Sequence, residues 1–162
     1  MAKEPKSLLA QLMHYCAYQE RCHTEVRYKL VELGARGDEL EHIMSELIAE
    51  NFLNEERYAC AFVRGKFYHK QWGKIKIIHA LKQKEISTYC INKGLKEISS
   101  EDYFETVTQL VIKKFKDLQE FDNVWEIKQK TFRYLVQRGF EFEIIQEIVN
   151  DNMGILNGSK EQ

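Results

Sequence analysis

Turn-forming residues are scarce in this sequence of 162 residues, which contains a single proline, Pro5, and eight glycines. A β-rich domain needs turn residues roughly every 8–12 positions, and this chain does not supply them. The shortage therefore predicts helices that are joined by short loops.

Long apolar runs are absent as well. No stretch approaches the roughly 20 residues that a membrane-spanning helix requires. The first residues, MAKEPKSLLAQ, lack the pattern of a signal peptide. We therefore expect a cytoplasmic protein with no membrane partner.

Motifs for catalysis are missing too. The sequence has no glycine-rich phosphate loop, no nucleophile elbow and no distinctive pair of carboxylates. His14 and His23 lie near two cysteines, but the spacing matches no common zinc site. The cysteines are widely spaced and are expected to be reduced thiols: Cys16, Cys22, Cys60 and Cys90. We expect neither an enzyme nor a cofactor or metal site.

Helical periodicity is what the chain does have. Residues 38–51 carry apolar side chains at helical spacing, namely Leu40, Ile43, Met44, Leu47 and Ile48. Asn54 and Ser99 stand where residues that cap the start of a helix are preferred. Similar stripes continue to about residue 149, so the composition and periodicity predict an all-α protein.

A three-fold internal repeat organises these helices. Three segments can be aligned on Leu30, Leu81 and Leu135, which lie 51 and 54 residues apart. Four residues after each leucine come Gly34, Glu85 and Gly139, which are expected to end a helix, because glycine adopts the left-handed conformation of a C-terminal cap at no steric cost.

The repeat predicts three tandem three-helix units that form an elongated array. We expect the units over residues 1–51, 52–98 and 99–152, followed by a flexible tail over 153–162. Each unit is too small to bury a large core, so neighbouring units are expected to share apolar surface.

Charge is unevenly distributed, although the formal net charge is only −1. No Asp or Glu occurs between residues 57 and 84, while the remaining residues carry 16 basic and 25 acidic side chains. Trp72 lies within this acid-free run. The predicted binding residues are Arg57, Arg64, Lys66, Lys70, Trp72, Lys74, Lys76, Lys82 and Lys84.

Two interpretations of this basic run remain open. Lysines with interleaved aromatic residues such as Tyr68, His69 and Trp72 can contact phosphates and stack bases in a nucleic acid. Lysines are also common on solvated helix faces, and Trp72 would then belong to the core.

A series of short motifs resembles the RecX family of bacterial regulatory proteins. Arg21 precedes a helix start at Thr24-Glu25, which leads to Lys29-Leu30. The segment FLNEERYA at 52–59 follows, and Gly73-Lys74 precedes Ile77 and Leu81. The match covers roughly residues 8–151. Arg27 and Glu85-Ile86 depart from the family pattern, which affects local contacts and not the architecture.

The resemblance implies a modulator of the RecA recombinase. RecX-like proteins bind along the groove of the RecA–DNA filament and inhibit its strand exchange, ATPase and coprotease activities. The expected role is therefore regulatory, in DNA repair, DNA recombination and the SOS response. The expected partners are the RecA filament and the DNA within it, and the chain is expected to be a monomer.

The sequence does not decide what the basic run contacts. DNA phosphates in the filament and an acidic surface of RecA both fit. A stand-alone DNA-binding protein that uses the central repeat is the alternative function. A helical adaptor for some other protein is a third.

Overall fold

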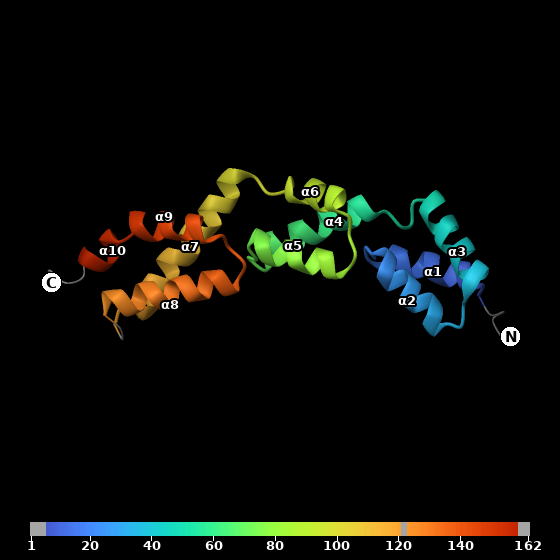
Figure 1. Ribbon diagram of the computed structural model, residues 1–162, viewed down its shortest axis with the longest axis horizontal. Coiled ribbons are helices and arrows are strands. Elements are labelled where there is room, and N and C mark those ends of the chain that lie inside the picture. Colours follow the sequence, from blue (N-terminus) through green and yellow to red (C-terminus); the bar gives the residue numbers. More distant parts are fainter. Residues whose placement is uncertain (1–5, 121–122, 159–162) are drawn as a thin grey trace. The chain divides into compact units, whose positions relative to one another are not determined.

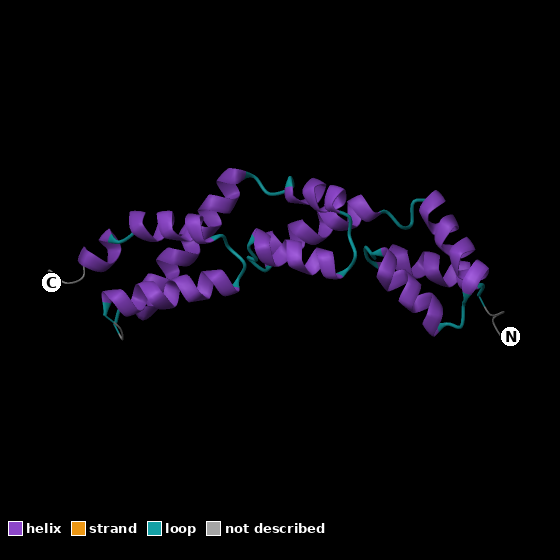
Figure 2. Ribbon diagram, viewed as in Figure 1, coloured by secondary structure: helices purple, strands orange, loops and turns teal. Residues whose placement is uncertain are grey.

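The computed structural model describes residues 6–120 and 123–158. Over these residues the chain forms helices and no strand, as Figure 2 shows. The prediction of an all-α fold is thereby confirmed. Within the same ranges, no helix combines the length and the apolar character that crossing a bilayer would require.

The chain divides into two compact units. Unit 1 comprises Met1–Phe62 and Leu81–Gly94, and unit 2 comprises Val63–Ala80 and Leu95–Gln162. The predicted repeat boundaries after residues 51 and 98 fall in loops between helices. The compact units instead divide the middle repeat: residues 52–62 and 81–94 belong to unit 1, and residues 63–80 and 95–98 belong to unit 2.

Unit 1 begins with three helices that pack against one another: α1 (Leu8–Tyr18), α2 (His23–Glu32) and α3 (Gly37–Ala49) (Figure 1). Their core contains the fully buried side chains of Leu12, Val26, Leu30 and Leu47. Burial of a leucine or valine side chain contributes about 1.5–3 kcal/mol. Most of the apolar stripe predicted at 38–51 supplies one wall of this core, but Ile48 is 48% exposed and lies outside it.

The rest of unit 1 is drawn from the middle repeat. It includes the first part of α4 (Glu55–Arg64), the last turn of α5 (Lys74–Gln83) and most of α6 (Thr88–Leu95). Asn54 caps α4 as predicted, since its Oδ1 accepts a hydrogen bond of 2.9 Å from the N–H of Arg57.

Unit 2 is built around a long helix. This helix, α7 (Ser100–Leu118), packs against α8 (Val124–Gln137), α9 (Phe142–Asp151) and the short α10 (Gly154–Asn157). Ser99 caps α7 as predicted, through a bond of 3.0 Å from the N–H of Asp102. The same unit holds the π-helical turn η1 (Gly65–His69), which continues α4, and the start of α5.

The predicted helix ends recur in all three repeats. Gly34, Glu85 and Gly139 have φ angles of 97°, 60° and 93°. In each repeat the residue after this position donates its N–H to the carbonyl of the anchoring leucine, over 2.9 Å at Leu30, 3.1 Å at Leu81 and 3.2 Å at Leu135. The prediction that these residues end helices is confirmed, and Glu85 does so without being glycine.

The C-terminal segment differs from the expected flexible tail over 153–162. Residues Gly154–Asn157 form α10, and the side chain of Leu156 is only 3% exposed. Burial of this apolar side chain in unit 2 orders a segment that carries no repeated apolar stripe. Residues 159–162 of the expected tail lie outside the described residues.

Candidate functional site

The predicted binding residues are distributed over both compact units. Arg57, Lys82 and Lys84 belong to unit 1. The others belong to unit 2: Arg64, Lys66, Lys70, Trp72, Lys74 and Lys76. Their local contacts differ, and several of these residues stabilise the fold.

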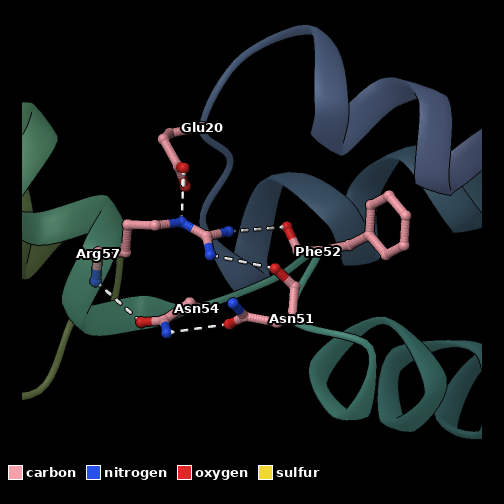
Figure 3. A network of polar contacts seen from close by, with 5 residues as sticks. All are labelled: Glu20, Asn51, Phe52, Asn54 and Arg57. Carbon is pink, nitrogen blue, oxygen red and sulfur yellow. Dashed lines mark hydrogen bonds and ion pairs between the residues drawn. The ribbon is translucent and has the colours of Figure 1, made fainter.

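Arg57 joins the start of α4 to two other segments of unit 1, as Figure 3 shows. Its Nε donates to Oε1 of Glu20 over 2.6 Å, and its terminal nitrogens donate to the carbonyls of Asn51 (3.1 Å) and Phe52 (3.3 Å). The guanidinium therefore supplies hydrogen-bond donors to a carboxylate and to the carbonyls that follow α3. Arg57 is a stabilising residue of unit 1, and its charge is largely neutralised.

Lys84 has a similar role. Its Nζ lies 3.1 Å from Oε1 of Glu25, while Oε2 of Glu25 accepts the N–H of Cys22 at the start of α2. The carbonyl of Lys84 also accepts the hydroxyl of Thr24 over 3.4 Å. These contacts join the loop after α5 to the start of α2 within unit 1. Lys82, by contrast, is exposed.

Arg64 also has a carboxylate partner. Its Nη1 lies 3.2 Å from Oε2 of Glu97, within unit 2. The partners of Arg57, Lys84 and Arg64 are thus glutamates that lie outside the acid-free run of the sequence. Carboxylates distant in sequence therefore offset the charge of three predicted binding residues, which the count along the chain does not show.

The Trp72 cluster consists of Lys66, Trp72 and Lys76. The two Nζ atoms lie 4.7 Å and 4.3 Å from the centroid of the indole ring. The N–H of Trp72 donates to the carbonyl of Lys66 over 2.9 Å, directly after Gln71, whose φ is 54°. A cation above an indole gains about 0.5–1 kcal/mol at an exposed site. The cluster therefore holds two ammonium groups at one point of the surface of unit 2.

The loop that carries Trp72 is fixed by Arg138. The guanidinium of Arg138 donates to the carbonyls of Lys70 and Gln71, the latter over 3.1 Å. Sequence reasoning did not identify Arg138, since it lies more than 60 residues from its partners. The side chain of Lys70 is exposed beside this loop.

Lys74 contributes to the core of unit 2. Its N–H donates to the hydroxyl of Tyr103 over 3.1 Å, and its Nζ lies 4.6 Å from the centroid of the Tyr103 ring. The Tyr103 hydroxyl in turn donates to Oε2 of Glu141 over 2.6 Å. Burial and this hydrogen bond raise the pKa of Tyr103 far above its usual value.

Two aromatic residues of the basic run, Trp72 and Tyr68, have polar partners. The ring of Trp72 is occupied by lysine ammonium groups, and the Tyr68 hydroxyl donates to Oδ2 of Asp102 over 2.5 Å. The Tyr68 ring itself is 46% exposed, so the basic run presents exposed aromatic surface as well as cationic groups.

A second cationic surface lies in the third repeat. Lys114 of α7 and Arg138 place their cationic groups 4.5 Å and 5.5 Å from the centroid of the Tyr134 ring. A hollow of about 230 Å³ is lined by Lys114 and Tyr134 together with Lys130 and Arg133. Positive charge therefore also gathers in the third repeat, because basic residues spaced along α7 and α8 converge in the folded unit.

The cysteine and histidine residues show no candidate metal centre. Among the described residues, Cys16, Cys22, Cys60 and Cys90 form no disulfide. Burial raises the pKa of the Cys16 thiol, which lowers its reactivity. Within residues 6–120 and 123–158, no group of three or more His, Cys, Asp or Glu side chains could hold a metal ion.

Two family models match the chain. The model for the second three-helix domain of RecX matches residues 54–95, and the model for the third matches residues 101–149. The first segment contains α4 to α6, and the second covers nearly all of α7 to α9.

Solved structures show the same fold. The crystal structure of RecX from Lactobacillus salivarius has a TM-score of 0.80 and 24% identity, with 88% of this chain and 92% of that chain covered. A crystal structure of another regulatory protein RecX has a TM-score of 0.79 and 24% identity, covering 89% of this chain and 70% of that chain.

Curated relatives are similar in sequence. The regulatory protein RecX of Neisseria meningitidis serogroup C is 31% identical over 148 residues, which cover 89% of this chain and 90% of that protein. The regulatory protein RecX of Clostridium perfringens strain 13 is 30% identical over 126 residues, or 77% of this chain. The chain spans only 58% of the length of that clostridial relative. The family models and the nearly full-length Neisseria alignment together show that this chain belongs to the RecX family.

Proposed function

We propose that this protein binds the RecA–DNA filament and inhibits the recombinase, ATPase and coprotease activities of RecA in DNA repair and recombination. The observation that carries the proposal is the alignment with the Neisseria regulatory protein RecX, 31% identical over 148 residues. The protein acts by binding and not by catalysis.

The Trp72 cluster is the part of the basic run best suited to DNA phosphates. Lys66 and Lys76 converge on one ring, and the exposed Lys70 lies in the loop next to it. Cations that meet phosphates release counterions, which makes the affinity depend steeply on salt. Arg57, Lys74 and Lys84 are assigned to the stability of the two units instead.

The direct test measures hydrolysis of ATP by the cognate RecA on single-stranded DNA, with and without this protein. We expect slower hydrolysis and co-sedimentation of the protein with the filament. Unchanged hydrolysis together with no co-sedimentation would refute the proposal.

A stand-alone DNA-binding function is the second candidate, and the Trp72 cluster is the observation that favours it. The double variant Lys66→Glu/Lys76→Glu distinguishes the two functions, with the exposed Lys116→Glu on α7 as the control. For DNA binding alone, the variant loses affinity for bare DNA and for filaments equally. For the proposed function, part of the filament affinity remains, because RecA itself contributes contacts.

Salt dependence measures the DNA contribution separately. At roughly 0.7 per phosphate contact on a single strand, loss of two lysines is expected to reduce the slope of log K against log salt by about 1.4. An unchanged slope would assign Lys66 and Lys76 to a protein surface.

A further inference from the structure

An apolar groove with cationic borders lies between α8 and α9 of unit 2. It has a volume of about 450 Å³, and Phe132, Val136 and Phe142 form its apolar surface. Val136 is 51% exposed and Phe142 is 55% exposed. The rings of Phe132 and Phe142 are in contact, with centroids 5.4 Å apart and an interplanar angle of 44°. Large apolar side chains are thus presented together at one point of the surface.

The equivalent helices of the first repeat show a different arrangement. The alignment of Leu30 with Leu135 makes Arg27 equivalent to Phe132 and Glu41 equivalent to Gln146. In unit 1 Arg27 and Glu41 form an ion pair that bridges α2 and α3. At the same positions of unit 2, an aromatic ring and a neutral amide line an open groove. The third repeat therefore has an apolar groove where the first repeat has a bridging ion pair.

The borders of the groove carry unpaired positive charge. Lys128 and Arg133 both line it, and neither forms an ion pair with any residue in the part of the chain that the structure describes. An occupant that complements both features has an apolar side chain for the aromatic floor and carboxylates for the two cations.

A protein segment fits this chemistry better than a nucleic acid does. Phe132, Val136 and Phe142 offer no hydrogen-bond donor to a phosphate, and a polyanion gains nothing from apolar surface. Phosphates are better matched by the Trp72 cluster, where two lysines converge.

We propose that the groove between α8 and α9 binds an acidic amphipathic segment of the recombinase protein. One apolar side chain of that segment contacts Val136 and Phe142, while its carboxylates pair with Lys128 and Arg133. This inference rests on the proposed function, because it names the protein component of the filament as the occupant. It assigns recombinase contact to the third repeat and DNA contact to the Trp72 cluster.

The first test replaces Val136 with aspartate in the full chain and measures co-sedimentation with filaments of the cognate recombinase. Val136 is exposed, so the fold tolerates the change. The matched control is Val31→Asp, since Val31 occupies the equivalent position of the first repeat and is 41% exposed. We expect roughly tenfold weaker filament binding for Val136→Asp, in the range of a central interface residue. The control and the affinity for bare DNA are expected to be unchanged.

The second test introduces the photo-cross-linking residue p-benzoylphenylalanine in place of Gln146, which also lines the groove. Irradiation of purified filaments is expected to join the protein to an acidic segment of the recombinase, as identified by mass spectrometry. A cross-link to the oligonucleotide, or no cross-link while the protein still co-sediments, would overturn the inference and leave the proposed function intact. Failure of the unmodified protein to co-sediment would overturn both.

Discussion

Gly73 and Gly139 meet backbone against backbone in unit 2. The N–H of Gly73 donates to the carbonyl of Arg138 over 2.7 Å, and the N–H of Ile75 donates to the carbonyl of Gly139 over 3.0 Å. A Cβ added at Gly73 would overlap the Gly139 backbone, and one added at Gly139 would overlap Lys76. This close approach fixes the loop after η1 against the end of α8, and with it the position of Trp72.

Substitution of Gly139 should therefore cost more than substitution of its counterpart in the first repeat. Gly34→Ala introduces a side chain at φ 97° into open space, at an expected cost of about 1–2 kcal/mol. Gly139→Ala adds a steric overlap with Lys76, at about 1–3 kcal/mol more. Urea denaturation of both variants measures how much free energy of unfolding each one loses. Equal losses would contradict the packing described for Gly73 and Gly139.

Glu85→Gly is expected to stabilise the protein. Glu85 adopts φ 60° at the position that Gly34 and Gly139 occupy in the other repeats. Glycine removes the conflict between Cβ and the backbone, with an expected gain of about 1 kcal/mol. The midpoint of urea denaturation should rise, and Glu85→Ala serves as the control that retains the Cβ. A fall in stability would mean that the Glu85 side chain contributes a contact of its own.

Arg57→Ala should reduce stability rather than partner binding. The substitution leaves Glu20 and the carbonyls of Asn51 and Phe52 without a donor, at an expected cost of about 1–2 kcal/mol for these partly exposed groups. Lys82→Ala, at an exposed residue, should change stability by less than about 0.5 kcal/mol. Denaturant titration and filament co-sedimentation measure the two effects separately. A binding defect in Arg57→Ala without a loss of stability would restore Arg57 to the binding surface.

Tyr103→Phe should lower stability and change its dependence on pH. The variant leaves the N–H of Lys74 without an acceptor and Glu141 without a donor, at an expected cost of about 1–2 kcal/mol. In the native protein the folded pKa of Tyr103 is raised above its unfolded value, so its stabilisation is complete below that value and is lost as the pH rises above it.

The difference in unfolding free energy between wild type and Tyr103→Phe should therefore shrink above the ordinary tyrosine pKa of about 10. Denaturation at about pH 8 and at about pH 11 measures this difference. If this free-energy difference is the same at both pH values, Tyr103 ionises equally in the folded and unfolded states.

Local features were predictable from the sequence. The scarcity of proline and the apolar stripes determined an all-α fold, because helical periodicity depends on neighbouring residues. Asn54 and Ser99 cap helices as expected, and Gly34, Glu85 and Gly139 end them, since these roles depend on backbone conformation within one turn. The motif series that resembles the RecX family likewise required no tertiary information.

The state of the charges was decided only by the tertiary structure. Glu20, Glu25 and Glu97 neutralise three of the predicted binding residues, although none of them lies in the acid-free run. Lys114 and Arg138 meet at Tyr134 from different helices. A charge count along the chain cannot give these pairings, because the attraction between two charges depends on their distance in space and is screened beyond about 10 Å.

Gly139 illustrates both what the sequence determines and what it does not. The sequence by itself determined that Gly139 ends a helix, since the pattern recurs three times. Only the tertiary structure decided that the Gly139 backbone packs directly against that of Gly73. It also decided that the groove of the third repeat is open at the positions where an ion pair bridges α2 and α3 in the first repeat. Packing between segments that are distant in sequence is responsible for both, because it depends on shape and not on local periodicity.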